Sequence, residues 1–315
     1  MTDQLMPKEE FFKALQAART PSHSSGHPFS NAWKAGELSK DDLGFWAMQM
    51  YYYIEDVTRM FSALFTRLPD LKARLLMLEN LNGEEFPDRH PDLLLDFAEA
   101  CGYSRERVKA GYLKGEILPS SMAMRSWIFE LATVRELSDA AAGIMIALEG
   151  QTPTVYPLYI EAGRKMGFTD EQLKFFHVHV EADEGHEEGG LEICATHAYT
   201  RELQDRAIAT VSNAARMRYQ MLTAIYDATV GARLQAAEKR CAGTLEKERL
   251  RWLPARPVGS AGQRSSCSAK PVQPLLRRAA ISNRSKKYLA ATIMYSRSGL
   301  ISLRKTKHVT PSPVH

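Results

Sequence analysis

The stretch FFHVHVEADEGHEEGG, residues 175–190, holds three histidines and five acidic residues. Successive residues of a helix turn by about 100°, so His179, Asp183 and His186 lie within about 60° of one another, whereas His177 and Glu181 face the other way. One face of the predicted helix therefore combines two imidazoles with a carboxylate. This donor set suits iron, manganese or zinc, and an ordinary solvated charged face is the alternative.

The same helix also predicts where this face lies in the fold. Leu173, Phe176 and Val180 form an apolar face beside the histidines, so the donor face is expected at the edge of a core. His197 has the same orientation, but it lies roughly 27 Å farther along the helix axis. It is therefore excluded from the site.

Most of the chain before residue 233 has the three- and four-residue apolar spacing of helices, and no segment has a convincing strand pattern. Ser39, Thr169 and Thr200 are expected to cap helix starts, and Gly102 and Gly167 to close helices. These patterns predict an all-α single bundle of about seven helices over residues 1–232.

The remaining segment, residues 233–315, has a different composition. It holds 18 Lys and Arg and 3 Glu, a net charge of +15, which leaves a net charge of −11 for residues 1–232. It is rich in Ser and Pro and lacks apolar periodicity, so we expect a disordered basic extension. A basic tail can also bind nucleic acid, but clustered stacking aromatics are missing, and nucleic acid is not the expected partner.

Composition also bears on the cellular compartment. The longest apolar run, residues 140–148, is too short to span a bilayer, and the first residues lack the order of a secretion signal. The four cysteines form no CxxC pair, which is typical of a reducing compartment. We therefore expect a cytoplasmic protein without membrane contact.

A metal site in a helical bundle needs ligands from other helices as well. Glu149 follows the long apolar run, and an unpaired buried carboxylate there would cost several kcal/mol, so a cation is a natural partner. A solvated carboxylate at a helix end is the alternative. Glu84, Glu85 and His90 form a second candidate group, and nearby prolines make an ordinary polar loop the alternative there.

Three segments together resemble a known family. The segment ENLNGEEFPDRHPDLLLDFAEACG (residues 79–102), Glu149, and the H-x3-D-x2-H pattern of residues 179–186 resemble the haem-oxygenase-like diiron oxidases. These are relatives of pyrroloquinoline quinone synthase and thiaminase II, and include the para-aminobenzoate synthase-like iron-containing redox enzymes. The opening HPFSNAWKAGELSKDDLGFWAMQMYYYIED (residues 27–56) looks similar too, so the resemblance spans about residues 8–230.

The resemblance implies two Fe²⁺ ions, with manganese as an option at one site, and O2 as co-substrate. The ligand set that it implies is Glu84, His90, Glu149, His179, Asp183 and His186. The spacing between Glu84 and His90 is one residue shorter than is common in the family, which leaves Glu85 as a rival ligand. An irregular stretch between prolines would also hold its ligands loosely, so we expect weaker metal binding at that half of the site.

The resemblance further implies an O2-activating oxidase that acts on a small organic molecule in a biosynthetic pathway. Family substrates include fatty acids, amino acids, arginine-derived groups and a tyrosine of the enzyme itself, and the sequence does not choose among them. Aromatic residues at helical spacing are usually core, but a substrate pocket is a second interpretation for Trp46, Tyr52 and Tyr53. Candidates to bind a substrate carboxylate are Arg59, Arg125, Arg135 and Arg164.

Three other functions are consistent with parts of the sequence. One is a cofactorless oxidase like pyrroloquinoline quinone synthase, and another is a thiaminase with Cys101 or Cys194 as nucleophile. The third is a non-enzymatic binding or regulatory protein with a nucleic-acid-binding tail. No tyrosine precedes Met50, and at most one of Tyr51–Tyr53 can reach a single pocket. We therefore expect an external small-molecule substrate. A homodimer is a separate expectation.

Overall fold

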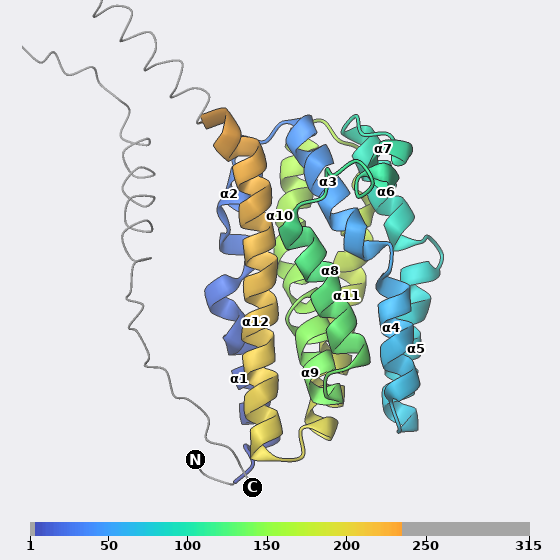
Figure 1. Ribbon diagram of the computed structural model, residues 1–315, viewed down its shortest axis with the longest axis vertical. Coiled ribbons are helices and arrows are strands. Elements are labelled where there is room, and N and C mark those ends of the chain that lie inside the picture. The colour runs from blue at the N-terminus through green and yellow to red at the C-terminus, as the bar shows by residue number, and fades with distance from the viewer. Residues whose placement is uncertain (1–3, 235–315) are drawn as a thin grey trace, which may run out of the picture. The chain divides into compact units, whose positions relative to one another are not determined.

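The computed structural model describes residues 4–234, except for the side chains of residues 181–184 and 186, and every regular element in this range is helical (Figure 1). This confirms the predicted all-α fold. The predicted extension, residues 233–315, lies outside the described residues apart from Arg233 and Leu234. The α-helices of the described range are α1 (Lys8–Arg19), α2 (Pro28–Lys34), α3 (Lys40–Ile54), α4 (Val57–Arg67), α5 (Leu71–Glu85), α6 (His90–Ala100), α7 (Arg105–Ala110), α8 (Pro119–Thr133), α9 (Leu137–Ala141), α10 (Thr152–Lys165), α11 (Lys174–His197) and α12 (Arg201–Tyr226).

The long helices run side by side along the bundle, with α4 and α5 at one edge (Figure 1). Helix α11 packs against α10, α9, α5 and α6, and therefore lies inside the bundle. Helix α12 packs against α1, α8 and α9. The histidine-rich helix is thus surrounded by the elements from which further ligands were expected.

Large aromatic side chains form the centre of the core. Trp33 of α2 stacks on Tyr159 of α10 with ring centroids 4.0 Å apart, and Trp46 of α3 stacks on Phe176 of α11 at 5.9 Å. All four side chains are at most 2% exposed. Each buried aromatic side chain contributes roughly 1.5–3 kcal/mol through the apolar surface removed from water. This cluster fixes α11 relative to three other helices.

The ends of several helices follow the sequence signals. Ser39 and Thr200 accept backbone N–H bonds at the starts of α3 and α12, as predicted. Gly102 and Gly167 follow α6 and α10 with φ values of +91° and +86°, a backbone conformation that glycine adopts without strain. Thr169 caps a turn that precedes α11 rather than α11 itself, which begins at Lys174.

The described chain has more helical segments than the seven or so expected, because two long helical patterns are interrupted. The first pattern is divided between α3 and α4 by Glu55 and Asp56. The second, which was expected to run to Glu149, is divided into α8, α9, a π-helical turn (Ala142–Ile146) and a 3₁₀ turn (Glu149–Gln151). Apolar periodicity continues through such interruptions, so it does not locate them.

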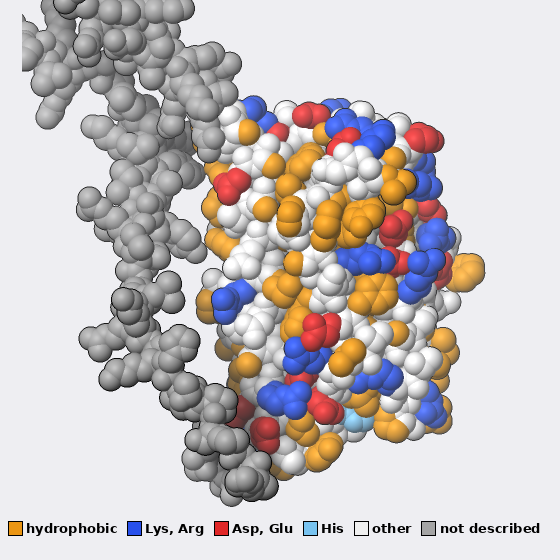
Figure 2. Space-filling model, viewed as in Figure 1, with side chains coloured by type: hydrophobic (Ala, Val, Ile, Leu, Met, Phe, Trp, Pro, Cys, Tyr) orange, Lys and Arg blue, Asp and Glu red, His pale blue; other side chains and the backbone are white. Residues whose placement is uncertain are grey.

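Charged and hydrophobic side chains are interspersed on the face drawn in Figure 2, with hydrophobic side chains gathered over α3 and α8. Within residues 4–234, no helix is long and apolar enough to cross a membrane. The cytoplasmic location stays a prediction.

Candidate metal centre

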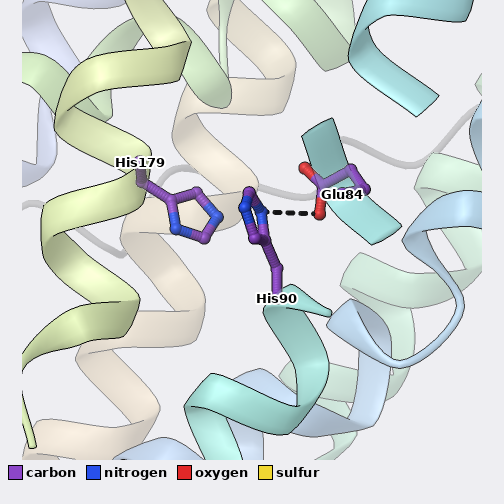
Figure 3. A group of neighbouring side chains, drawn as sticks. All are labelled: Glu84, His90 and His179. Carbon is purple, nitrogen blue, oxygen red and sulfur yellow. Dashed lines mark ion pairs between the residues drawn. The ribbon is translucent and has the colours of Figure 1, made fainter. Parts of the chain in front are cut away.

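Three side chains from three helices meet in the interior of the bundle (Figure 3). Glu84 lies in the last turn of α5, His90 is the first residue of α6, and His179 lies in the first half of α11. Each offers one ligand atom, and these atoms lie within 4.8 Å of one another. Glu84, His90 and His179 are only 3%, 4% and 9% exposed. Two imidazoles and a carboxylate are therefore close enough to bind one metal ion.

The junction between α5 and α6 places Glu84 next to His90. Only residues 86–89 separate the two helices, and Pro91 occupies the first turn of α6, where its missing N–H costs no hydrogen bond. The irregular stretch is thus shorter than the sequence indicated, and both candidate ligands belong to helices. The expectation of an irregular segment that carries Glu84 is corrected, whereas the strength of metal binding there stays a prediction.

Glu84 and His90 interact directly. Glu84 Oε2 lies 2.9 Å from His90 Nδ1. Both atoms could therefore bind one metal ion, with the imidazole neutral and the carboxylate ionised. The rings of His90 and His179 have centroids 4.3 Å apart, so the second imidazole lies beside the pair.

A backbone carbonyl holds the imidazole of His179. The Nδ1 atom lies 2.6 Å from the carbonyl oxygen of Phe175, one helical turn earlier. A carbonyl can only accept, so Nδ1 carries the proton and Nε2 is the nitrogen with the lone pair. Metal-binding histidines commonly have this arrangement, which fixes both the tautomer and the ring orientation.

Glu85, the rival of Glu84, has other partners. It accepts hydrogen bonds from Thr58 Oγ1 at 2.6 Å and from Arg89 Nε at 2.9 Å. The hydrogen bond from Thr58 holds the pKa of Glu85 below its usual value, with smaller contributions from Arg89. Its side chain is 31% exposed. The geometry therefore brings Glu84, and not Glu85, to the two histidines.

Glu149 lies in an irregular segment that α11 crosses closely. A Cβ atom at Gly190 of α11 would lie 2.5 Å from Met145 Cβ in the π-helical turn, so only glycine allows this approach. Arg19 donates to the carbonyl of Ile146 at 2.8 Å, and Arg218 donates to the carbonyl of Leu148 at 2.8 Å. These bonds hold two carbonyls of the irregular segment in place, and the carbonyl of Leu148 also accepts from the N–H of Gln151.

The six residues of the predicted ligand set thus divide into two groups. Glu84, His90 and His179 come together, and Glu149 is not part of that three-residue group. Asp183 and His186 lie on α11, but their side chains are outside the described ones, so their predicted positions stay predictions. A π-helical turn such as the one before Glu149 is frequent at functional sites.

The two histidines excluded from the site have surface partners. His177 Nε2 lies 3.5 Å from Asp170, and His197 Nε2 lies 3.5 Å from Asp70. The helix geometry that separated His179 from His177 therefore agrees with the structure.

The aromatic residues considered for a substrate pocket do not line one cavity. Trp46 is 1% exposed and packs within the aromatic core. Tyr52 stacks on Tyr112 with ring centroids 5.5 Å apart and lines a cavity of 380 Å³ between α3, the residues around α7, and α8. Tyr53 does not line that cavity, and its hydroxyl lies 3.3 Å from Met50 Sδ.

The four arginines considered as carboxylate binders all pair with acidic side chains of the protein. Arg59 and Arg125 pair with Asp56, Arg135 with Glu130, and Arg164 with Asp170. The cysteines considered as nucleophiles are buried. Burial raises the pKa of Cys101 to about 12 and that of Cys194 further still, so neither thiol forms a thiolate near neutral pH.

The sequence analysis missed Arg218, which is 6% exposed. A signal was present, because Arg218 continues the apolar face of α12 formed by Val211, Ala215 and Leu222. An arginine on the core-facing side of an amphipathic helix is a buried charge, and such a charge needs an explanation.

The comparisons with known proteins concern the family and the fold. The family described as "Iron-containing redox enzyme" matches residues 45–219. The 4-aminobenzoate synthase of Chlamydia muridarum is 32% identical over 180 residues, which are 56% of this chain and 74% of that protein. The bifunctional coenzyme PQQ synthesis protein C/D of Methylorubrum extorquens is 26% identical over 232 residues, which are 72% of this chain and 61% of that protein.

A solved structure from Shewanella denitrificans, described as a domain of unknown function with a haem oxygenase-like fold, has a similar architecture. Its TM-score is 0.58 at 16% identity, and the match covers 71% of this chain and 94% of that one. The likeness concerns the fold alone, and it confirms the predicted haem-oxygenase-like bundle. The family match covers more than half of the sequence. The chain therefore belongs to the iron-containing redox enzyme family.

Proposed function

We propose that this protein is a non-haem diiron oxidase that activates O2 and oxidises a small organic molecule. The observation that carries the proposal is the buried group of Glu84, His90 and His179. Imidazole nitrogen together with carboxylate oxygen fits iron or manganese, and three protein ligands leave coordination positions open for O2. The proposed second iron takes Glu149, Asp183 and His186 as ligands.

The irons, when bound, supply the electrons that O2 needs. The residues of this chain position the ligands and exclude water. The carbonyl of Phe175 fixes the ring of His179. The ring centroids of Phe175 and Tyr156 lie 4.4 and 5.7 Å from the ring centroid of His179. An apolar wall of this kind keeps a reactive oxygen species from water. Glu84 Oε2 and His90 Nδ1, which lie 2.9 Å apart, would each supply one ligand atom.

The proposal is tested by O2 uptake of the Fe(II)-loaded full chain in the presence of a reductant. H179A is expected to lose most of the iron-dependent uptake, because it removes a central ligand. H177A is the matched control, since His177 lies on the same helix but pairs with Asp170. Equal uptake by H179A and the unchanged protein contradicts the proposal.

The similarity to a PQQ synthesis protein favours a cofactorless oxidase as the second candidate. The two candidates differ in their response to a chelator. A diiron oxidase loses O2 uptake when iron is removed and regains it when Fe(II) is restored. Uptake that survives complete removal of the metal favours the cofactorless mechanism.

We also propose that the substrate is external, although one relative is named as a 4-aminobenzoate synthase and the family includes an enzyme that consumes its own tyrosine. Tyr51 and Tyr52 both line the cavity beside α7, so the expectation that at most one of the three tyrosines reaches a single pocket is wrong. None of Glu84, His90 and His179 lines that cavity, which supports an external substrate. Intact-mass spectrometry after reaction with Fe(II), O2 and reductant checks this. We expect an unchanged mass, and a discrete loss that maps to a tyrosine contradicts an external substrate.

A further inference from the structure

Arg218 is a buried cation whose charge no carboxylate of the described residues neutralises. Its side chain is 6% exposed and donates to the carbonyl of Leu148, and the phenol of Tyr156 lies within electrostatic reach of its charge. No acidic side chain among those that the structure describes lies within ion-pair distance of its guanidinium. Removing a charge from water is costly unless an opposite charge compensates it.

Arg19 shows how the fold treats a comparable arginine. Arg19 and Arg218 each donate to a carbonyl of the irregular segment before or beside Glu149. Arg19 also forms an ion pair with Glu187 at 2.8 Å, and both side chains are 14% exposed. Both arginines thus bind a backbone carbonyl. Among the described residues, only Arg19 also has a carboxylate as counter-ion.

Arg218 lies next to the candidate metal centre. Tyr156, which interacts electrostatically with Arg218, has a ring centroid 5.7 Å from that of His179. Leu148, whose carbonyl it binds, directly precedes Glu149. A group bound by Arg218 would therefore lie close to both the observed ligand cluster and the proposed second iron.

Three tyrosines lie within electrostatic reach of the guanidinium: Tyr53, Tyr156 and Tyr159. Burial raises the pKa of Tyr53, and it raises that of Tyr159 to about 12, while the positive charge of Arg218 opposes both shifts. These effects place both phenols within electrostatic reach of the same cation. Ring faces and edges form an apolar boundary for the body of a small ligand.

A cavity at α10 and α12 lies within reach of the charge of Arg218, although Arg218 is not among its lining residues. A 400 Å³ cavity is lined by Thr154 of α10 and Tyr219 of α12, two residues before Tyr156 and one after Arg218. His23 also lines it, and the pKa of His23 is lowered by burial and by the charges of Arg19 and Arg218. The charge of Arg218 therefore extends to the lining of an open cavity.

We propose that Arg218 binds the carboxylate of the substrate, which is accordingly a small monoanionic carboxylic acid with an apolar, aromatic-sized body. A planar guanidinium matches a carboxylate with two parallel hydrogen bonds, and one such cation neutralises one negative charge. The ligand supplies the counter-ion that the described side chains do not. This inference rests on the proposed oxidase function, because it assigns the substrate class of the same site.

Calorimetric titration of the full chain with benzoate tests the inference, with benzamide as the neutral ligand of the same shape. The titration is carried out on the protein as purified and after anaerobic Fe(II) loading, and needs no turnover. The unchanged protein should bind benzoate at least tenfold more tightly than benzamide. R218M should weaken benzoate binding tenfold or more and leave benzamide binding unchanged.

The control is R216M, because Arg216 is exposed on the same helix and contacts only Asn213 among the described residues. It should bind benzoate like the unchanged protein. If R218M does not fold, R218K and Y156F provide the test, since lysine keeps the charge without the two-pronged geometry. Both should weaken benzoate binding severalfold.

Equal affinities for benzoate and benzamide, or unaltered benzoate affinity in the folded Arg218 variants, overturn the inference. Iron content, measured on the same samples, separates the two proposals. Normal iron content without selective benzoate binding refutes the carboxylate site alone, whereas absence of stoichiometric iron refutes the oxidase.

Discussion

The two segments that bring candidate ligands to α11 are built in different ways. At the junction of α5 and α6, Glu84 and His90 lie at ordinary helix ends and meet through a direct contact of 2.9 Å. The segment around Glu149 is instead a π-helical turn followed by a 3₁₀ turn that begins at Glu149, and arginines from α1 and α12 bind two of its carbonyls. The first segment positions ligands by helix geometry, and the second depends on distant side chains.

The largest expected effect concerns the regular segment. Glu84→Ala should remove most of the iron from the site that His90 and His179 form, because it deletes the only carboxylate of that group. Glu85→Ala should change iron content little, since Glu85 binds Thr58 and Arg89. Iron content after anaerobic loading, measured by elemental analysis, compares the two variants. The reverse order would show that the other carboxylate is the ligand.

The irregular segment should respond to a change in α11 instead. Gly190→Ala places a methyl group 2.5 Å from Met145 Cβ, an atom that cannot move without its backbone. We expect a loss of about 1–3 kcal/mol in the free energy of unfolding, the usual cost of overpacking. Urea denaturation followed by circular dichroism measures it.

Gly185→Ala is the matched control for that substitution. It lies on the same helix, and a Cβ atom there meets nothing within 4 Å among the described neighbours. Alanine favours the helix over glycine by roughly 0.5–1 kcal/mol, so this variant should be as stable as the unchanged protein or more stable. A destabilised Gly185→Ala together with a neutral Gly190→Ala would contradict the predicted close approach.

His27 differs from the two histidines of the candidate metal centre, because both of its ring nitrogens have hydrogen-bond partners in the protein. His27 Nδ1 accepts from the N–H of Phe29 at 3.0 Å, and Nε2 donates to Thr223 Oγ1 at 3.0 Å. Burial lowers the pKa of His27 from 6.5 to about 4. Between these pH values only the unfolded chain takes up the proton, so the free energy of unfolding falls as the pH falls through this window.

The variant His27→Asn keeps a capping side chain without this titration. The decrease in unfolding free energy between pH 6.5 and 4 should therefore be smaller in the variant than in the unchanged protein. Urea denaturation of both proteins at several pH values, without added metal, measures the difference. Identical pH dependence would show that His27 does not titrate in this way.

The smallest effect is expected outside the described bundle. Residues beyond about 240 carry much of the excess positive charge and lack helical periodicity, so deleting residues 241–315 should leave melting temperature and iron content almost unchanged. Differential scanning calorimetry and elemental analysis of the truncated chain check this. Loss of folded protein would show that the extension contributes to the bundle.

The sequence predicted those features that depend on residues close together in the chain, such as helix faces and helix ends. The apolar spacing of residues 173–180 placed one face of α11 in the core, and His179 but not His177 in the candidate site. Ser39 and Gly102 marked helix ends because capping and left-handed backbone depend on single residues. Glu84 and His90 lie close together because only a short connection separates the end of α5 from the start of α6.

The remaining features depend on contacts between segments that are far apart in sequence. Nothing in residues 140–151 alone shows that the helix changes to a π-helical turn there, and Arg19 and Arg218, which bind the carbonyls of Ile146 and Leu148, are far away in sequence. The choice between Glu84 and Glu85 depends on Thr58, 27 residues away. The position of Arg218 beside Leu148 likewise depends on a contact between α12 and a segment far away in sequence.

The measurement that tests the central claim most directly is the iron stoichiometry of the full chain after anaerobic loading with Fe(II). The ligand cluster of Glu84, His90 and His179, completed by the proposed second set, predicts about two iron ions per chain, of which His179→Ala loses at least one. Binding of zinc alone, or no stoichiometric metal in the unchanged protein, would contradict a diiron oxidase.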